Sequence, residues 1–512
     1  MILRDSPDYF ERNRSLSPAL VAAGIALGTY IPTLAGTFIY DDVDLWNDPR
    51  ISQPALWGKF FTESYNYGVD NLYRPLVLLS FGIQRQITGD RPMPLHAVNW
   101  ILHALVSALV AILAVRLSGR RSAGYVAGIA FAVLPIHVEA VANLVGRAEL
   151  MCAVGVIGAL IMLLHRPMTI GRVLAAIGLL VLAIGSKEQG FLLPVLAGLM
   201  ALCLGIRRPA SERERRAMLW LIVLGCWTTA GLIVYRESIL KFGWDRSQLE
   251  WVQQPLINAR GWSGRMMPFA LLGRYAALLV WPAELSIDYG GRVIGWQTGG
   301  HDFFLWLGLA TLLAWMIGVL ITWRRGNGAA LFCLLATAVL YAMVGNFVVL
   351  IGTIFGERLL YLPSAFLCIF LGDLAARSLQ RIMVGLLVFI AVWGGLRSNM
   401  YARQWNDRLA FYQSQLIAQP LSPRLAMLVA YEQMSEGKLI DAAETDCIAR
   451  DRTPDYWDLW LQSGKVALAE GEFDSADRYF ARAFEMHPGV IAASWRAKVF
   501  TARAATQAAT KP

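Results

Sequence analysis

Residues 95–117 read LHAVNWILHALVSALVAILAVRL, a run of 23 residues in which Arg116 is the one Lys, Arg, Asp or Glu. About 20 apolar residues in a helix span the hydrocarbon core of a bilayer. The run therefore predicts a membrane-spanning helix. Apolar runs recur through the first 400 residues, at 19–38, 95–117, 123–134, 150–165, 173–184, 191–204, 217–235, 304–323, 330–350, 359–375 and 382–396. We predict an all-α, polytopic membrane protein with about eleven transmembrane helices.

The composition agrees with a membrane protein. Hydrophobic residues make up 56% of the 512 residues and charged residues 16%, whereas soluble domains carry about 25% charged residues. The net charge of +9 comes largely from arginines in short loops between apolar runs, so no nucleic-acid partner is expected. None of the six cysteines has metal-ligand spacing, so we expect neither a disulfide framework nor a zinc site.

The basic loops predict the topology. With eleven spans, the arginine-rich segments all fall on one side, which the positive-inside rule assigns to the cytoplasm. The long loops 40–94 and 237–301 and the C-terminal tail then lie outside, in a periplasm or equivalent lumen, and a bacterial inner membrane is the expected location. Residues 265–282 are apolar but contain Arg274, and counting them as a span would place Arg324 and Arg325 outside. We therefore expect this segment to lie at the external membrane face or to dip into it.

Residues 401–512 are more polar and contain a repeat. Pro420, Pro454 and Pro488 are 34 residues apart, and small and aromatic positions such as Gly464 and Phe480 fit the tetratricopeptide (TPR) pattern. We predict a membrane domain over residues 1–400 and a TPR domain over residues 401–512. Two full repeats are fewer than the three or so that a free solenoid needs, so the tail should pack on the membrane part or on a partner.

Two carboxylates, Asp41 and Asp42, open the first external loop directly after an apolar run. A carboxylate at a membrane face is costly unless it is solvated or has a function. One reading is a polar helix end. The other is a general base or metal ligand that faces an external cavity, with Asp42 the candidate for a divalent cation. No other cofactor is expected.

A second polar group lies between two apolar runs, with no long loop to hold it. It comprises His137, Glu139, Asn143, Arg147 and Glu149. If this segment is helical, Glu139, Asn143 and Arg147 share one face. Two readings stay open: an internal network that pins two helices, or the polar wall of a substrate cavity.

Charged residues also occur at other external turns, with Lys187 and Glu188 at one and Arg358 at another. Arg and Lys at the same membrane face as the acidic pair suit a phosphate group. His96, Asn99 and His103 lie on the second predicted span at helical spacing, and we interpret them as interhelical hydrogen-bonding residues.

Several of these blocks resemble one family. The blocks are residues 40–44, 73–76, 95–104, 135–141, 146–150, 187–190 and 357–364. They are similar, in family order, to the transmembrane and TPR-containing (TMTC) protein O-mannosyltransferases and their bacterial relatives. The repeat tail follows where that family has one, although eukaryotic members carry many more repeats.

The resemblance implies a GT-C glycosyltransferase fold, a polyprenyl- or dolichyl-phosphate sugar donor, and transfer to a protein hydroxyl on the external face. The family's acidic pair maps onto Asp41 and Asp42, one of which would be the catalytic base. Arg147, Lys187 and Arg358 are candidates for neutralising the departing phosphate. The tail would contact the protein acceptor. The expected substrate-binding residues are Arg74, His137, Glu139, Arg147, Lys187, Glu188, Arg358 and Tyr361.

Two other functions stay open at this point. One is a non-enzymatic membrane scaffold that recruits a partner through its tail. The other is a transporter of a lipid-linked sugar, which broken helices at mid-membrane would favour. The charged residues of this sequence instead gather at one predicted face.

Overall fold

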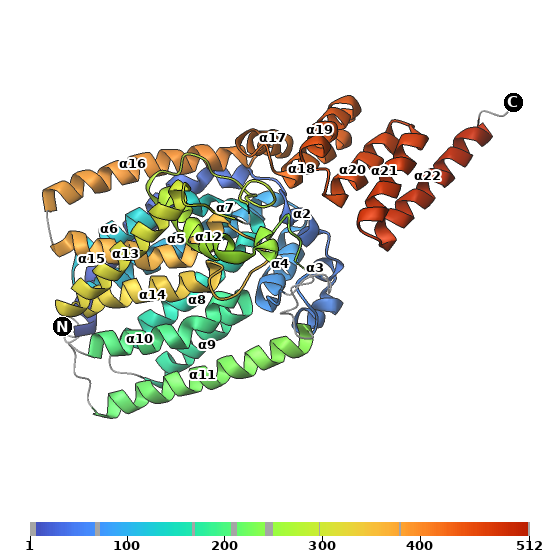
Figure 1. The fold of residues 1–512 in the computed structure, drawn as a ribbon. Helices are drawn as coiled ribbons and strands as arrows, with labels where there is room; N and C mark the ends of the chain where they lie inside the picture. Colours follow the sequence, from blue (N-terminus) through green and yellow to red (C-terminus); the bar gives the residue numbers. More distant parts are fainter. Residues whose placement is uncertain are drawn as a thin grey trace.

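The computed structural model describes residues 7–66, 72–165, 169–205, 212–240, 249–295, 297–377 and 380–509. Within these residues every regular element is a helix, which confirms the all-α prediction. The helices form a bundle and a separate tail that projects from one end of it (Figure 1).

In this part of the chain, each of the eleven predicted spans overlaps an α-helix of the bundle, although the first α-helix ends at Tyr30, before the predicted end at residue 38. These helices are α1 (Pro7–Tyr30), α5 (Pro92–Ser118), α6 (Arg121–Ala132), α8 (Arg147–Leu164), α9 (Ile170–Ser186), α10 (Leu193–Gly205), α11 (Glu212–Leu240), α13 (Phe303–Arg324), α14 (Gly328–Val344), α15 (Tyr361–Arg377) and α16 (Gln380–Gln404). Residues 345–350 had been predicted to extend α14. The helix ends before them because Asn346 adopts a positive φ of 57°.

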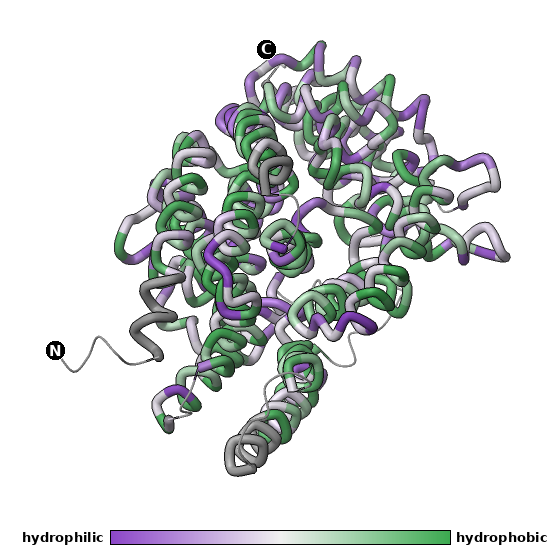
Figure 2. The backbone as a smooth tube through the Cα atoms, turned by 90° about the vertical axis from the view of Figure 1, so that its left-hand side faces the viewer, coloured by the Kyte–Doolittle hydropathy of each residue, from purple (hydrophilic) through white to green (hydrophobic). Residues whose placement is uncertain are grey.

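Six segments of the described chain are long and apolar enough to cross a membrane, or seven if a bent pair counts as one span. The bent pair joins α6 to residues 135–142 at an angle of 56°, and α9 and α14 are apolar but shorter. Figure 2 shows hydrophobic residues dominating the helices of the bundle. The protein is therefore a multi-pass membrane protein, and the count of eleven spans stays a prediction.

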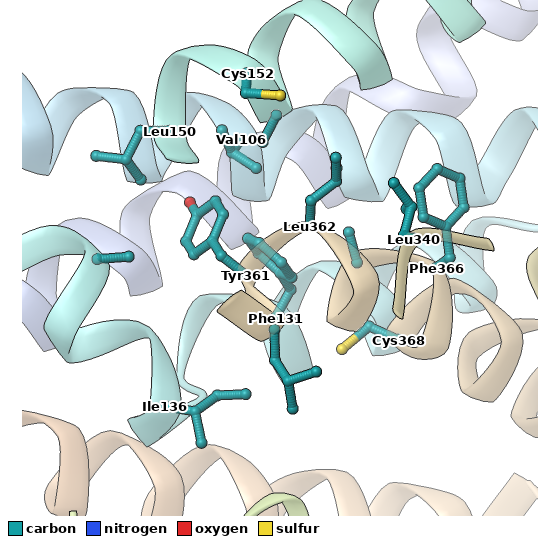
Figure 3. Close-up of a cluster of buried hydrophobic side chains, with 14 of the residues drawn as sticks. Val106, Phe131, Ile136, Leu150, Cys152, Leu340, Tyr361, Leu362, Phe366 and Cys368 are labelled. Atoms are coloured by element: carbon teal, nitrogen blue, oxygen red, sulfur yellow. The ribbon is translucent and has the colours of Figure 1, made fainter. Parts of the chain in front are cut away.

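Small residues let the bundle helices approach closely. A Cβ atom at Gly155 of α8 would lie 2.6 Å from the carbonyl oxygen of Leu179 on α9, and one at Gly372 of α15 would lie 2.5 Å from that of Ala123 on α6. Membrane helices commonly pack through such residues, because lipid tails provide no hydrophobic force between helices. Around these contacts, apolar side chains from α5, α6, α8 and α15 fill the centre of the bundle (Figure 3).

Short helices fold the predicted loop 40–94 onto the end of the bundle that carries the tail (Figure 1). They are α2 (Asp41–Trp46), α3 (Pro49–Ser52), the 3₁₀ helix η2 (Pro54–Phe61) and α4 (Pro75–Thr88). Arg50 is fully buried and donates to the Asp48 carboxylate and to the carbonyl oxygens of Ser64 and Tyr65. Its guanidinium thus holds the loop in one conformation.

The predicted loop 237–301 contains the 3₁₀ helix η7 (Pro255–Asn258) and the 20-residue helix α12 (Gly261–Val280). A Cβ atom at Gly273 of α12 would lie 2.0 Å from the carbonyl oxygen of Phe304, so α12 packs directly on the start of α13. This helix is not among the candidate spans of the described chain. Its position relative to the membrane face stays a prediction.

The tail consists of α17 (Arg408–Ala418), α18 (Pro423–Ser435), α19 (Leu439–Arg452), α20 (Trp457–Ala469), α21 (Phe473–Met486) and α22 (Val490–Ala509). Pro420, Pro454 and Pro488 each follow the end of a helix, as the 34-residue spacing predicts. Gly464 of α20 packs against the ring of Phe480 on α21, where a Cβ atom would lie 2.5 Å from the ring. The assignment of these hairpins to the TPR class stays a prediction.

The tail packs on the membrane part, one of the two arrangements expected for so few repeats. Val252 of the predicted loop 237–301 lies in one apolar cluster with Ala426, Tyr456 and Leu459 of the tail. The indole nitrogen of Trp457 donates to Glu250 (3.3 Å). The tail is therefore fixed against loop 237–301 through α18 and the start of α20.

Candidate functional site

The acidic pair sits on a tight turn between the first span and α2. The amide of Asp42 donates to the carbonyl oxygen of Ile39 (3.2 Å), and Tyr40 has φ 58° and ψ −122°. These angles are those of the first central residue of a type II′ turn, a position usually taken by glycine. The turn sends the side chains of Asp41 and Asp42 into different surroundings.

Asp42 is fully buried. Its carboxyl oxygens accept hydrogen bonds from the backbone amides of Val145 (3.1 Å) and Ile39 (3.5 Å). Burial raises the pKa of Asp42 to about 8, although the backbone amides that it contacts work in the opposite direction. This carboxyl group ties α2 to the segment that precedes α8.

Asp41 is accessible, with 40% of its side chain exposed. Its carboxylate lies 3.4 Å from the guanidinium of Arg358, in the 3₁₀ helix η8 (Glu357–Leu360). Arg358 is also 3.4 Å from Glu139 through its side chain, and its backbone amide donates to Glu139 (2.9 Å). Arg358 therefore lies between two carboxylates, of which Asp41 is the more exposed.

Two further ion pairs extend the group formed by Asp41, Arg358 and Glu139. Arg74, at the start of α4, pairs with Glu188 (2.9 Å), and the buried Lys187 pairs with Glu149 of α8. Burial lowers the pKa of Lys187, whereas the Glu149 carboxylate opposes that shift. We call the seven residues Asp41, Arg74, Glu139, Glu149, Lys187, Glu188 and Arg358 the charged cluster.

The charged cluster does not include Arg147. Its buried guanidinium donates to Asn99 (3.0 Å) and to the carbonyl oxygen of Leu95 (3.0 Å), and it lies 3.8 Å from the centre of the Phe81 ring. The common helical face predicted for Glu139 and Arg147 is wrong. The chain leaves the helical conformation at Asn143 (φ −77°, ψ 127°), so α7 (Val138–Ala142) ends before α8 begins.

His137 and Tyr361 also lie away from the charged cluster, in the apolar centre of the bundle. His137 contacts the Ser364 hydroxyl (2.9 Å) through Nε2, and the Tyr361 hydroxyl contacts Nδ1 of His103 (2.8 Å). Figure 3 shows Tyr361 near Phe131 among apolar side chains. For these two residues and Arg147, the geometry is that of a network that pins helices together. The interhelical contacts of Asn99 and His103 agree with their predicted role. The same prediction is wrong for His96, because neither of its ring nitrogens forms a hydrogen bond among the described residues.

Several residues around the turn make contacts that the sequence analysis does not predict. Glu357 is buried and accepts hydrogen bonds from the Ser286 amide and the Tyr289 hydroxyl, both at 2.7 Å. From the tail, the Tyr412 hydroxyl accepts a hydrogen bond from the Tyr40 amide (2.7 Å), and the Arg424 guanidinium lies 5.1 Å from the centre of the Tyr40 ring. These hydrogen bonds join residues between 68 and 372 positions apart, so no local pattern marks them.

No group of three or more His, Cys, Asp or Glu side chains that could hold a metal ion occurs in the described residues. Both carboxyl oxygens of Asp42 already accept backbone hydrogen bonds. A divalent cation at Asp42 stays a prediction to which this geometry adds no support.

Comparison with protein-family models finds no match. Individual relatives are found. The chain is 25% identical to protein O-mannosyl-transferase F38B6.6 of Caenorhabditis elegans over 474 residues, covering 88% of this chain and 64% of that protein. It is 24% identical to protein O-mannosyl-transferase Tmtc1 of Drosophila melanogaster over 512 residues, covering 80% and 58%.

A shorter region is more similar. Over 140 residues the chain is 38% identical to human protein O-mannosyl-transferase TMTC2, covering 25% of this chain and 16% of that protein. The curated homologues are thus TMTC-family protein O-mannosyltransferases, which confirms the resemblance seen in the motifs. The chain spans less than two thirds of the length of each of these relatives.

Proposed function

We propose that this protein is a membrane glycosyltransferase of the GT-C type. It moves a sugar from a polyprenyl- or dolichyl-phosphate donor to a hydroxyl group of an extracytoplasmic protein. The observation that carries the proposal is the accessible carboxylate of Asp41 beside Arg358, next to two more cationic side chains and at the end of a membrane bundle. The printed names of the homologues favour mannose as the sugar.

In this proposal Asp41 is the general base. The acceptor hydroxyl attacks the anomeric carbon while its proton passes to the Asp41 carboxylate. The bond between that carbon and the phosphate oxygen breaks, and polyprenyl phosphate leaves with the electron pair. A base placed in this way contributes roughly 10²–10⁴-fold to the rate. Asp41 suits the role better than Asp42, since Asp42 is buried and bonded to the backbone.

The departing phosphate gains negative charge, and cations near it would stabilise the transition state. Arg358 is the nearest candidate because it already contacts Asp41. Arg74 and Lys187 follow, each paired with a glutamate of the charged cluster. Arg147 is left out, since its guanidinium is occupied by internal contacts. His137 and Tyr361 would act indirectly, because their contacts in the centre of the bundle hold the helices that carry the site in position.

The experiment uses the full chain in lipid nanodiscs with radiolabelled polyprenyl-phosphate mannose and extracted cell-envelope proteins as acceptors. We expect label in protein, and we expect Asp41→Asn to lower the rate by roughly 100-fold or more. Asp44→Asn is the matched control, because Asp44 is an exposed carboxylate on the same short helix.

A rate in Asp41→Asn equal to that of Asp44→Asn would remove Asp41 from the mechanism. Polyprenyl-phosphate glucose serves as the second donor. An absence of turnover with both donors, combined with movement of the intact lipid across the bilayer, would favour the transporter reading. The bent pair of α6 and residues 135–142 is the feature that such a reading would use.

A further inference from the structure

The turn that places Asp41 is held in an unfavourable backbone conformation. Tyr40 has a side chain, yet it occupies the positive-φ position of a type II′ turn, which favours glycine. A strained residue of this kind persists only where its surroundings over-determine it, and such residues cluster at functional sites. The contacts around Tyr40 therefore show what holds the base in place.

Part of what holds Tyr40 comes from the tail. The Tyr40 amide donates to the hydroxyl of Tyr412, a buried residue of α17, at 2.7 Å. The guanidinium of Arg424, on α18, lies 5.1 Å from the centre of the Tyr40 ring. Both the backbone and the side chain of Tyr40 are thus contacted by the first two tail helices.

These tail helices are themselves anchored to the predicted loop 237–301. Asp288 pairs with Arg424 (3.2 Å) and accepts a hydrogen bond from the Ser422 hydroxyl (2.5 Å), and the Ile287 amide donates to Gln415 (3.1 Å). The neighbouring Ser286 amide donates to Glu357, which immediately precedes Arg358. One set of contacts therefore connects the tail to both members of the Asp41–Arg358 pair.

We infer that α17 and α18 are part of the catalytic unit, and that Tyr412 and Arg424 are positioning residues for Asp41. They act by holding the Tyr40 turn, and neither is assigned a role in the chemistry. The inference rests on the proposed function for its catalytic meaning, whereas the clamp on the turn can be tested without any substrate. It assigns the start of the tail a role beyond acceptor binding.

The first test measures amide hydrogen exchange by mass spectrometry on the full chain in nanodiscs. Tyr412→Phe removes the hydroxyl that accepts from Tyr40 but keeps the ring. We expect exchange in peptides covering residues 38–46 to become about tenfold faster, with α20 and α21 unchanged as a check on folding. Tyr431→Phe is the control, because Tyr431 is an exposed tyrosine of α18. Unchanged exchange in residues 38–46 of a folded Tyr412→Phe protein would overturn the clamp.

The second test measures turnover of polyprenyl-phosphate mannose. Tyr412→Phe should lower kcat about tenfold with little change in KM for the donor, because a displaced base affects the chemical step. In an Asp41→Asn background the same change should cause no further loss, since Tyr412 acts through Asp41. Additive losses, or faster exchange with normal kcat, would overturn the positioning role. If the unmodified protein turns over no donor, the proposed function fails, and the exchange test still decides the clamp.

Discussion

We predict that the stability of the tail depends on pH through Asp446. It lies on α19 with 1% of its surface exposed, and neither carboxyl oxygen forms a hydrogen bond among the described residues. The nearby Ser463 hydroxyl donates instead to the carbonyl oxygen of Leu459 (2.9 Å). Burial raises the pKa of Asp446 from 3.8 to about 7, although Arg450 and Lys465 work in the opposite direction.

The direction of the pH effect follows from this shift. Below pH 4 the Asp446 carboxyl group is protonated in both the folded and the unfolded protein, so its contribution to stability is fully present. That contribution is lost as the pH rises through the folded pKa of about 7. The difference between the two pKa values corresponds to a ceiling of about 4 kcal/mol. Asp446→Asn removes the charge but leaves a buried amide that also lacks partners. We therefore expect a net gain of about 1–3 kcal/mol at pH 8.

The assay is amide hydrogen exchange of the full chain in nanodiscs at pH 5 and pH 8, corrected for the intrinsic exchange rate. Peptides from α19 and α20 should be less protected at pH 8 than at pH 5, and Asp446→Asn should remove most of that difference. Asp441→Asn is the control, since Asp441 is exposed on the same helix. Equal protection at the two pH values in the unmodified protein, or weaker protection in Asp446→Asn at pH 8, would refute the reasoning.

Four further predictions concern topology and the site. Reporter fusions at Gly205 and at Ala508 should report opposite sides of the membrane, and the same side for both would contradict the eleven-span topology. Asp42→Asn should lower turnover less than Asp41→Asn, because the amide oxygen still accepts the shorter of the two backbone hydrogen bonds, from Val145; a larger loss would restore Asp42 as the base. Arg147→Ala should destabilise the protein by about 2–4 kcal/mol, measured by thermal unfolding, because it leaves the buried oxygens of Asn99 and Leu95 without a donor; a folded variant with weakened donor binding would count against this. Deleting residues 421–512 should abolish turnover in a protein that still inserts into membranes, and full activity would separate the tail from the site.

Much of the fold was predictable because its causes are local. The length of an apolar run is enough to predict a membrane-spanning helix, and the run at 95–117 corresponds closely to α5. The tail helices end where Pro420 and Pro454 forbid continuation. The turn carrying Asp41 was also predictable as a candidate site, because charged residues directly after a span need solvent or a function.

Other features could not be read from the sequence. At the helix break, the Asn143 side chain accepts a hydrogen bond from the Val145 amide. An Asn side chain can make such a bond or can point away from the backbone within a helix, and the sequence does not show which occurs. The sequence offers Arg147 as a phosphate-binding residue. Only the structure shows that its guanidinium already donates hydrogen bonds to Asn99 and to the carbonyl oxygen of Leu95. Our proposal prefers Asp41 to Asp42 as the base because Asp42 is buried, and burial is a property of tertiary structure.

The pairing of Arg358 bears on the order of events in the proposed reaction. This guanidinium already neutralises Asp41, so an incoming phosphate and the carboxylate compete for one cation. The charged cluster contains three cationic side chains and four carboxylates, so it has no excess of positive charge that would bind a phosphate by itself. Arrival of the donor then loosens the hold on Asp41, and the base becomes free to take a proton only once the sugar is in place. A compulsory sequence, with lipid donor before acceptor, is the kinetic signature of that exchange.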